Sequence, residues 1–372
     1  MVVFPKDAFE AAVSGLDIWW NIVFPALLPF FVISQVLIGL GVVHMMGIFL
    51  EPVMRPLFNV PGTGSFVMAM GLASGFPIGA ILTAELRSRS LCSRVEAERL
   101  VSFTNTADPL FMFGAVAVGM LHYPRAGLII TASHYLSSIA LGLIMRFYRR
   151  NEASSGEPFP CRGRIVQRAC TALLQAREKD GRPLGQLMGD AIRESVNTLL
   201  LIGGFIILFS VIIRILGVMG AIGVLSDYLT VYVEALGLNP DLTPALLSGF
   251  FEIDLGCQYT ALLTQVPITE KIIACGVIIA WSGLSVHAQV ASINTGTDIR
   301  IFPFIIARVI HAILAGTCSA LLLGPGQRWL GNFTIPVILN TVPRGTFSFW
   351  WARTAFMLQQ LAIFSTALLA LA

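Results

Sequence analysis

Two neighbouring stretches decide the fold of this chain: GLASGFPIGA at residues 71–80 and SFTNTADPLFMFGAVAVGM at residues 102–120. In both, glycine, proline and small polar residues interrupt sequence that is otherwise apolar enough for a membrane. Lipid offers no hydrogen bonds, so an interrupted helix survives at membrane depth only where protein or a water-filled cavity supplies partners for its backbone. We therefore expect both stretches to line a site inside a membrane protein.

The composition of the whole chain is that of a membrane protein. Of its 372 residues 56% are hydrophobic and only 12% are charged, and the mean hydropathy is +0.79. Because soluble domains carry about 25% charged residues, we predict a polytopic membrane protein with the lipid bilayer as its main partner. The net charge of +3 forms no basic stripe with interleaved aromatic residues, which excludes nucleic acid as a partner.

No pattern in the sequence indicates a catalytic or metal centre. The six cysteines lack the CxxC spacing of a zinc site and lie mostly in or beside apolar segments. The HExxH, GxSxG and paired-aspartate patterns of hydrolases are absent as well. We therefore expect no metal, no cofactor and no catalytic residue. An intramembrane enzyme, using carboxylates and histidines in a wet cavity, is the alternative class.

The apolar segments of the first half are predicted to form different kinds of element. We predict a first span over residues 16–43, kinked by Pro25 and Pro29, and an interfacial helix over residues 46–58. Residues 65–86 are predicted to form a re-entrant helical hairpin, because SGFPIG interrupts them with a proline and two glycines.

A broken span and a straight span complete the first half. Residues 100–121 are predicted to be broken at Pro109, and residues 126–147 to cross back. Arginines cluster at residues 87–99 and again at residues 146–150, and both clusters indicate the cytoplasmic side.

The second half follows a polar, basic segment over residues 149–195. This segment is predicted to be a cytoplasmic linker with an amphipathic helix near residues 165–176. Beyond it we expect spans at residues 196–218, 272–293 and 301–323, a second interrupted segment at residues 244–263, and a last apolar segment from Thr346.

The two halves resemble each other when shifted by about 176 residues. The matched pairs include Asn21 with Asn197, Ser34 with Ser210, the Ser-Gly-Phe triplets at residues 74–76 and 248–250, and His134 with His311. Each half would contain three crossings, and an odd number inverts the second copy. Inverted repeats with interrupted helices are the architecture of secondary transporters, whose solutes bind near the midplane.

The predicted fold is thus an all-α polytopic membrane protein of two inverted repeats, each with a re-entrant hairpin and a broken helix. The expected division is a first repeat at residues 1–148, the cytoplasmic linker at 149–195, a second repeat at 196–324, and a loop with a C-terminal transmembrane helix at 325–372.

Polar residues at the interruptions of both halves are the expected solute-binding residues. They are Ser74, Gly75, Phe76, Thr104, Asn105, Thr106 and Asp108 in the first half, and Ser248, Gly249, Ser282, Ser285, His287, Gln289 and Arg308 in the second. The alternatives are structural: serine and threonine can bond back to their own helix, and Asp108 can cap the half-helix that begins at Pro109.

Glu252 and Asp254 lie inside the second interrupted segment. An ionised carboxylate at membrane depth costs several kcal/mol, so such a residue usually has a task. We expect the pair to couple transport to H⁺, Na⁺ or Ca²⁺, or to orient the solute. The alternative is that the segment reaches the outer interface and water solvates both carboxylates.

The sequence also resembles a known family, through GLASGFPIGA, RVEAERLVSFTNTADPLFMFGAVAVGML and SGFFEIDLGC. These runs are similar to the YlbJ family of sporulation integral membrane proteins, also called the stage V sporulation protein V family, within the nucleoside-recognition (Gate) group. The similarity extends from the first span to about Leu323. It implies transport of dipicolinic acid across the outer forespore membrane, and it assigns no ligand residues.

Dipicolinate is a planar pyridine with two carboxylates, which helix N-termini, amides, hydroxyls and Arg308 would suit. Glu252 and Asp254 would repel this dianion unless they were protonated or paired with a cation. A nucleoside or a metal ion as the solute, and a sporulation scaffold that transports nothing, are the alternatives. The protein is also a candidate homo-oligomer.

Overall fold

The computed structural model describes residues 2–152, 155 and 164–324, and every regular element within them is helical. The chain divides into two units, Met1–Ala320 and Leu321–Ala372. The second is described only as far as residue 324, so the apolar segment expected from Thr346 lies outside the described residues. The all-α membrane fold predicted from the sequence is confirmed.

Among the described residues, five helices are long and apolar enough to cross a membrane. They cover Pro5–Gly39, Arg125–Met145, Leu184–Val218, Ile268–Asn294 and Ile301–Leu323.

The first span begins earlier than predicted. It consists of α1 (Pro5–Ile18), a π-helical turn η1 (Trp19–Val23) and α2 (Phe24–Gly39). Pro25 cannot donate a backbone hydrogen bond to the preceding turn, and the wider π turn just before it accommodates the missing bond. A π turn therefore stands where the sequence predicts a kink.

The next segment is one helix that packs against part of the linker. It runs through α3 (Val42–Val53) into η2 (Met54–Phe58), slightly longer than the predicted residues 46–58. The linker helix α8 (Ile165–Asp180) contacts α3 closely: a Cβ on Gly41 would lie 2.4 Å from the carbonyl oxygen of Leu173.

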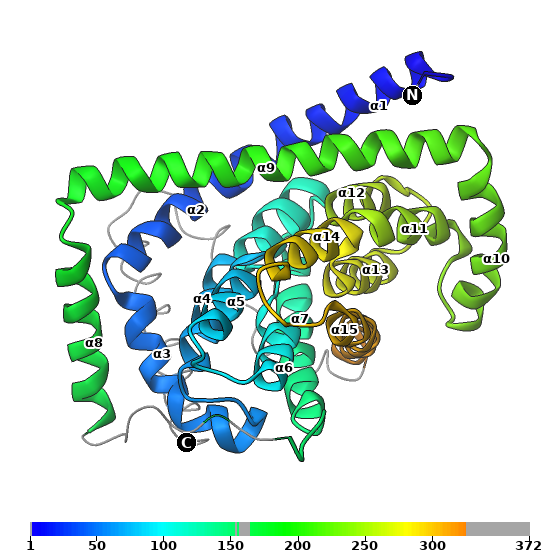
Figure 1. The fold of residues 1–372 in the computed structure, drawn as a ribbon. Helices are drawn as coiled ribbons and strands as arrows, with labels where there is room; N and C mark the ends of the chain where they lie inside the picture. Colours follow the sequence, from blue (N-terminus) through cyan, green and yellow to red (C-terminus); the bar gives the residue numbers. More distant parts are fainter. Residues whose placement is uncertain (1, 153–154, 156–163, 325–372) are drawn as a thin grey trace, which may run out of the picture. The chain divides into compact units, whose positions relative to one another are not determined.

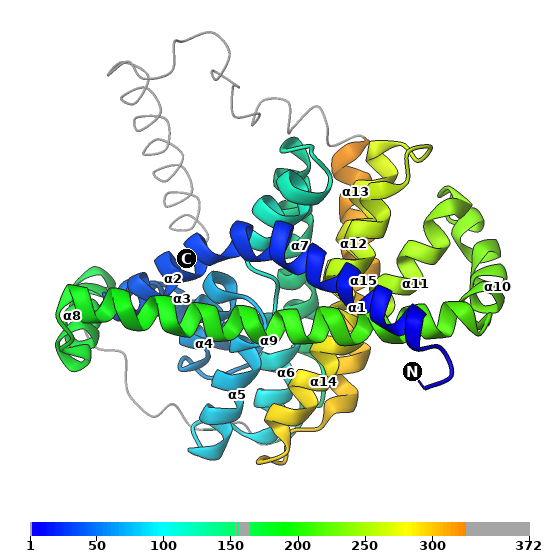
Figure 2. The same cartoon turned by 90° about the horizontal axis from the view of Figure 1, so that it is seen from above.

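The predicted linker boundary at residue 195 does not coincide with a helix boundary. Helix α9 (Leu184–Val218) begins inside the predicted linker, directly after Pro183, and continues through the span. It lies along α1, between α8 at one end and α10 (Ala221–Ala235) at the other (Figures 1 and 2). Trp19 Nε1 donates to the carbonyl of Leu199 at 2.8 Å, which joins the two helices.

Two pairs of short helices occupy the predicted hairpin segments. The first hairpin consists of α4 (Gly64–Ser74) and α5 (Ile78–Ser88), and the second of α11 (Thr243–Phe251) and α12 (Ile253–Leu262). A short 3₁₀ turn, η4 (Pro240–Leu242), precedes the second hairpin. The chain is interrupted at residues 75–77, where SGFPIG predicts a break, and the re-entrant course of the hairpin stays a prediction.

Each hairpin is followed by a broken helix and a straight one. In the first half these are α6 (Arg94–Thr104) with η3 (Phe111–Met120), and then α7 (Arg125–Met145). In the second half they are α13 (Ile268–Trp281) with α14 (Gly283–Asn294), and then α15 (Ile301–Leu323). The order of elements is the same in both halves, while their opposite orientation stays a prediction.

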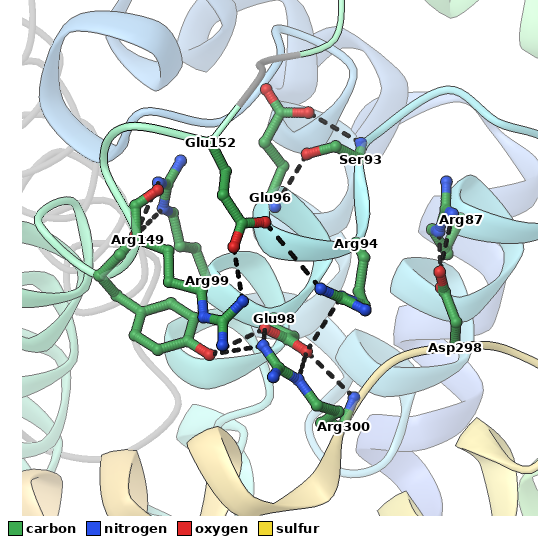
Figure 3. A network of polar contacts seen from close by, with 11 residues as sticks. Arg87, Ser93, Arg94, Glu96, Glu98, Arg99, Arg149, Glu152, Asp298 and Arg300 are labelled. Carbon is green, nitrogen blue, oxygen red and sulfur yellow. Dashed lines mark hydrogen bonds and ion pairs between the residues drawn. The ribbon is translucent and has the colours of Figure 1, made fainter.

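A network of charged residues joins the two halves at the start of α6 (Figure 3). A capping box of Ser93 and Glu96 begins the helix. One turn further, the buried Glu98 accepts hydrogen bonds from Arg300 Nε at 2.7 Å and Nη2 at 3.0 Å. Arg87 at the end of α5 pairs similarly with Asp298, in the loop between α14 and α15.

The Glu98–Arg300 pair is partly shielded from water. Burial alone would raise the pKa of Glu98, but hydrogen bonds from Arg300 and from the Tyr148 hydroxyl hold it below its ordinary value. The interactions of Glu98 therefore contribute their full stabilisation at pH values above its unfolded-state pKa, which is about 4.3. This stabilisation is lost as the pH falls through the lower, folded-state pKa.

Replacing Arg300 by glutamine should destabilise the protein, because it leaves the buried carboxylate of Glu98 with only the longer ion pair to Arg94, at 3.9 Å. We expect a clear fall in the melting temperature of the purified protein at pH 7, and a smaller difference from the unmodified protein below about pH 4. Arg89→Gln is the matched control, since the Arg89–Glu85 pair is exposed. Equal effects of the two substitutions would contradict the assigned role.

Candidate functional site

Three glycines let the first hairpin rest directly on the unwound backbone that follows α6. A Cβ at Gly71 or at Gly79 would lie 2.0 Å or 2.6 Å from the carbonyl oxygen of Thr104, and one at Gly75 would lie 2.8 Å from a carboxylate oxygen of Asp108. The glycines are spaced by four residues, one on each arm and one in the turn. No larger residue fits without displacing the unwound segment.

Side chains of α7 hold this segment from another side. The N–H group of Ala107 donates to His134 Nε2 at 3.2 Å, and its carbonyl accepts from the Tyr135 hydroxyl at 3.0 Å. Ser138 Oγ donates to the carbonyl of Phe103 at 2.7 Å. The break therefore keeps its hydrogen bonds without water, as a buried site in a membrane requires.

Arg308 on α15 completes the support. Its guanidinium donates through Nη1 to the carbonyl of Asn105 at 3.2 Å and through Nη2 to the carbonyl of Ser102. Both carbonyls lie at the C-terminal end of α6, where a positive group interacts favourably with the helix dipole. In this structure Arg308 thus binds backbone rather than lining a pocket.

The second break is built differently. Ser282, between α13 and α14, has a left-handed conformation with φ +76°, and Gly283 approaches the backbone at Glu252 closely. Glu252 separates α11 from α12 and caps α12, accepting the N–H of Leu255 at 3.1 Å. Trp281 Nε1 donates to the carbonyl of Phe250 at 2.9 Å, so the end of α13 is attached to the second hairpin.

One pocket brings both turns and both breaks together. We call it the break pocket; its cavity volume is about 70 Å³. Its lining comes from the first hairpin (Phe76, Pro77), the break after α6 (Ala107, Asp108, Phe111), the second hairpin (Glu252, Ile253, Asp254), α14 (Ser285, Val286, Gln289), α2 (Leu27, Phe31) and α9 (Thr198, Leu201, Ile202, Phe205). In this conformation the pocket has room for a few water molecules rather than for a whole solute.

The charged groups of the break pocket are all acidic. Asp108, Glu252 and Asp254 line it, and none of its lining residues is a lysine or arginine. Asp108 accepts the N–H groups of Leu110 and Phe111 at 2.9 Å and 2.8 Å, which confirms the capping role considered from the sequence. Asp254 Oδ1 is buried and has no hydrogen-bond partner among the described residues.

Six of the sequence-predicted site residues line the break pocket: Phe76, Asp108, Glu252, Asp254, Ser285 and Gln289. Four others shape the breaks around it. Gly75 and Gly249 allow close packing, Ser282 supplies the left-handed residue, and Thr106 donates to the carbonyl of Gly71 at 3.4 Å.

The remaining predicted residues lie elsewhere. Thr104 bonds back to Leu100, and Ser248 bonds back to Pro244 and lines a second cavity beside Arg214. The ring of His287 packs between Trp281 and Phe304, with centroids 4.4 Å and 5.3 Å away. The side chains of Ser74 and Asn105 have no hydrogen-bond partner among the described residues. Binding roles for this group stay predictions.

Sequence reasoning missed the wall formed by α2 and α9. Its residues are apolar apart from Thr198, and an apolar residue in a span carries no mark that separates a pocket wall from a lipid-facing surface. Only the assembled fold places these residues opposite the two breaks.

Comparison with known proteins agrees with this architecture. Residues 21–149 match the model of the Gate family, described as nucleoside recognition. The sporulation integral membrane protein YlbJ of Bacillus subtilis (strain 168) is 48% identical over 326 residues, which cover 86% of this chain and 79% of that protein. The chain belongs to the YlbJ family. The resemblance seen in the sequence is therefore confirmed, and the protein is an integral membrane protein of a sporulation family.

Two solved structures share the fold of this chain. They are CNTnw in an inward-facing substrate-bound state, with a TM-score of 0.51 and 14% identity, and a variant of CNTnw in an outward-facing state, with a TM-score of 0.50 and 12% identity. The match to the inward-facing structure covers 88% of this chain and 79% of the CNTnw chain. The match to the outward-facing variant covers 82% of this chain and 76% of the CNTnw chain. At this level of identity the likeness shows that the fold is shared.

Replacing Gly71 by alanine should prevent the first hairpin from seating on Thr104, because the obstacle is a backbone oxygen that cannot rotate away. We expect a large loss of folded protein, measured by size-exclusion chromatography in detergent, or a fall of several kcal/mol in stability. The matched control is Gly204→Ala in α9, where a Cβ meets no atom within 4 Å. There alanine should be neutral or stabilising by up to about 1 kcal/mol. Equal tolerance of both substitutions would contradict the proposed seating.

Proposed function

We propose that this protein is a secondary transporter that carries a small polar solute by alternating access through the break pocket. The observation that supports this is the convergence of four interrupted elements, two from each half, on a single pocket. Interrupted helices expose backbone groups and helix ends to a solute at membrane depth, and repeats of this kind move against one another during transport. A purely morphogenetic scaffold gives no reason for a polar pocket at this place.

We propose dipicolinate as the transported solute. Its two carboxylates would meet Asp108, Glu252 and Asp254, which repel a dianion at neutral pH. We infer that dipicolinate enters the pocket with a cation or while these carboxyls are protonated. H⁺, Na⁺ and Ca²⁺ are the candidate coupling ions, and Glu252 and Asp254 are the candidate coupling residues.

A nucleoside is the second candidate solute. Three carboxylates with no lysine or arginine among the lining residues suit the hydroxyl donors of a ribose better than they suit an unaccompanied dianion. The Gate match and the shared fold with CNTnw agree with this possibility.

The cellular setting belongs to the same proposal. The outer forespore membrane is the proposed location, with the polar linker of residues 149–195 in the mother-cell cytoplasm. The arginines at the start of α6 and beyond α7 support this orientation by the positive-inside rule. A homo-oligomer is a further part of the proposal, to be tested by the mass of the purified protein in detergent.

Glu252→Gln should reduce uptake of labelled dipicolinate into proteoliposomes by about tenfold or more, and should remove its dependence on an imposed pH or Na⁺ gradient. Glutamine keeps an oxygen that can accept the N–H of Leu255, so the substitution removes charge while preserving the cap. Asp227→Asn is the control, because Asp227 is exposed on α10 and distant in sequence from every pocket-lining residue. Unchanged uptake and unchanged gradient dependence in Glu252→Gln would exclude coupling through this residue.

The same proteoliposomes can separate the candidate solutes. Uptake of dipicolinate, uridine and divalent metal ions is measured in parallel under pH and Na⁺ gradients. Dipicolinate uptake alone would support the first proposal, and uridine uptake alone the second. No uptake of any solute under any gradient would remove the transporter proposal for the protein acting by itself.

A further inference from the structure

The second cavity, which Ser248 and Arg214 line, shares no lining residue with the break pocket. It lies between α1, the last turns of α9, the start of α10, η4 and the second hairpin. Its volume is about 460 Å³, against about 70 Å³ for the break pocket, and this is within the range of sites that bind small molecules. In this conformation the protein therefore has room for a ligand in the second cavity.

The depth of the second cavity in the membrane follows from α9 and α10. Arg214 and Gly217 lie in the last turns of α9, at the end remote from α8 (Figure 1). Tyr228 and Tyr232 of the adjoining α10 are largely exposed, and tyrosine is enriched where a bilayer meets water. The second cavity is therefore expected at the level of the lipid headgroups rather than in the hydrocarbon core.

Arg214 is the one lysine or arginine among the residues that line the second cavity. One of its terminal nitrogens, Nη2, donates to Asp7 at 2.8 Å. A guanidinium has five N–H donors, and those of Arg214 that do not bind Asp7 have no acceptor among the described residues. The hydroxyl of Tyr259, which also lines the cavity, likewise has no partner in the described part of the chain. These donors suit the oxygens of a phosphate group.

Two carboxylates line the same cavity. Glu10 lies three residues beyond Asp7 on α1, so it is only about 5 Å further along the helix axis than the partner of Arg214. Its ion pair with Lys6, at 3.8 Å, is exposed and therefore weak. Asp241 forms no ion pair with any residue that the structure describes. A cavity with a guanidinium and two available carboxylates suits a ligand that carries both a negative and a positive group.

The rest of the lining is mostly apolar and continues onto the lipid-facing surface. The apolar lining residues are Ala11, Ile213, Ile222, Pro244, Ala245 and Leu263. Next to them in the chain, Val218, Met219, Val224 and Leu225 are exposed where α9 meets α10. A ligand with hydrocarbon chains could thus extend from the cavity over this surface, which a soluble zwitterion would leave uncovered.

We propose that the second cavity binds the headgroup of a phospholipid that carries a phosphate and a primary amine, the chemistry of phosphatidylethanolamine. Arg214 and Tyr259 hold the phosphate. Glu10 and Asp241 hold the ammonium group, and the acyl chains lie along the apolar residues where α9 meets α10. This inference does not depend on the proposed transport, because the two pockets have no residue in common.

The test measures the melting temperature of the purified full-length protein in detergent as single lipids are added, and native mass spectrometry counts the lipids retained. Phosphatidylethanolamine should raise the melting temperature saturably, by at least about 3 °C, with one lipid retained per chain. Phosphatidylglycerol, which lacks the amine, and phosphatidylcholine, whose ammonium has no N–H donor, should act more weakly. Soluble phosphoethanolamine is tested in parallel.

Gly217→Leu removes the space without removing a charge. A Cβ at Gly217 meets no atom within 4 Å, so leucine should fill part of the second cavity and abolish the response while the protein still folds. Gly189→Leu is the matched control, because Gly189 is equally open on the same helix and does not line the cavity.

Two further variants test the charges. Arg214→Gln should weaken the affinity for phosphatidylethanolamine by about tenfold or more. Arg193→Gln is its control, an exposed arginine of α9 that pairs with Asp190 at 3.7 Å. Glu10→Gln combined with Asp241→Asn should shift the preference from phosphatidylethanolamine to phosphatidylglycerol, because the groups that bind the amine and repel an anionic headgroup are removed.

A response to phosphatidylethanolamine that Gly217→Leu and Arg214→Gln reduce and their controls retain supports the proposal. Equal stabilisation by all three lipids would show nonspecific coating of an apolar surface and would overturn it. An undiminished response in a folded Gly217→Leu, or no response to any lipid, would do the same. A saturable response to phosphoethanolamine equal to that of the lipid would assign the cavity to a soluble zwitterion instead.

Discussion

The structure depends on one constraint: the unwound backbone between α6 and η3 must keep its hydrogen bonds where lipid supplies none. Arg308 pairs the carbonyls that the end of α6 leaves free, and His134 and Tyr135 pair both backbone groups of Ala107. Because these partners come from α7 and α15, the break cannot form before helices from both halves have assembled. The unwound backbone between α6 and η3 is therefore stable only as part of the whole fold.

The two breaks solve this problem in different ways, and the difference sets the chemistry of the break pocket. After α6, side chains from neighbouring helices satisfy the backbone, and Asp108 caps the half-helix that follows. In the second half, a left-handed Ser282 turns the chain, and Glu252 caps α12. Both caps are carboxylates at helix N-termini, where the helix dipole stabilises negative charge. The acidic lining thus follows in part from how the breaks are capped.

The sequence predicted the positions of the interruptions well, because glycine, proline and asparagine mark them directly. It also identified Asp108, Glu252 and Asp254, since a carboxylate in an apolar segment is rare. It could not predict where Arg308 and His287 point, because the same buried polar residue can face a pocket or a helix end. The start of α9 was missed as well, since residues 184–195 are amphipathic and resemble a linker until they are seen packed. The four-residue spacing of Gly71, Gly75 and Gly79 was a usable signal for close packing.

Two arginines near the start of α15 bond α6 at different levels. Arg300 pairs with Glu98, and Arg308, about 12 Å further along the helix axis, pairs with the carbonyls of Ser102 and Asn105. Attachment at two points prevents α15 from tilting or sliding along α6 without breaking charged hydrogen bonds. In contrast, α9 contributes only apolar side chains and Thr198 to the break pocket. Any movement that opens the pocket should therefore occur at the surface of α9, while α6 and α15 move together.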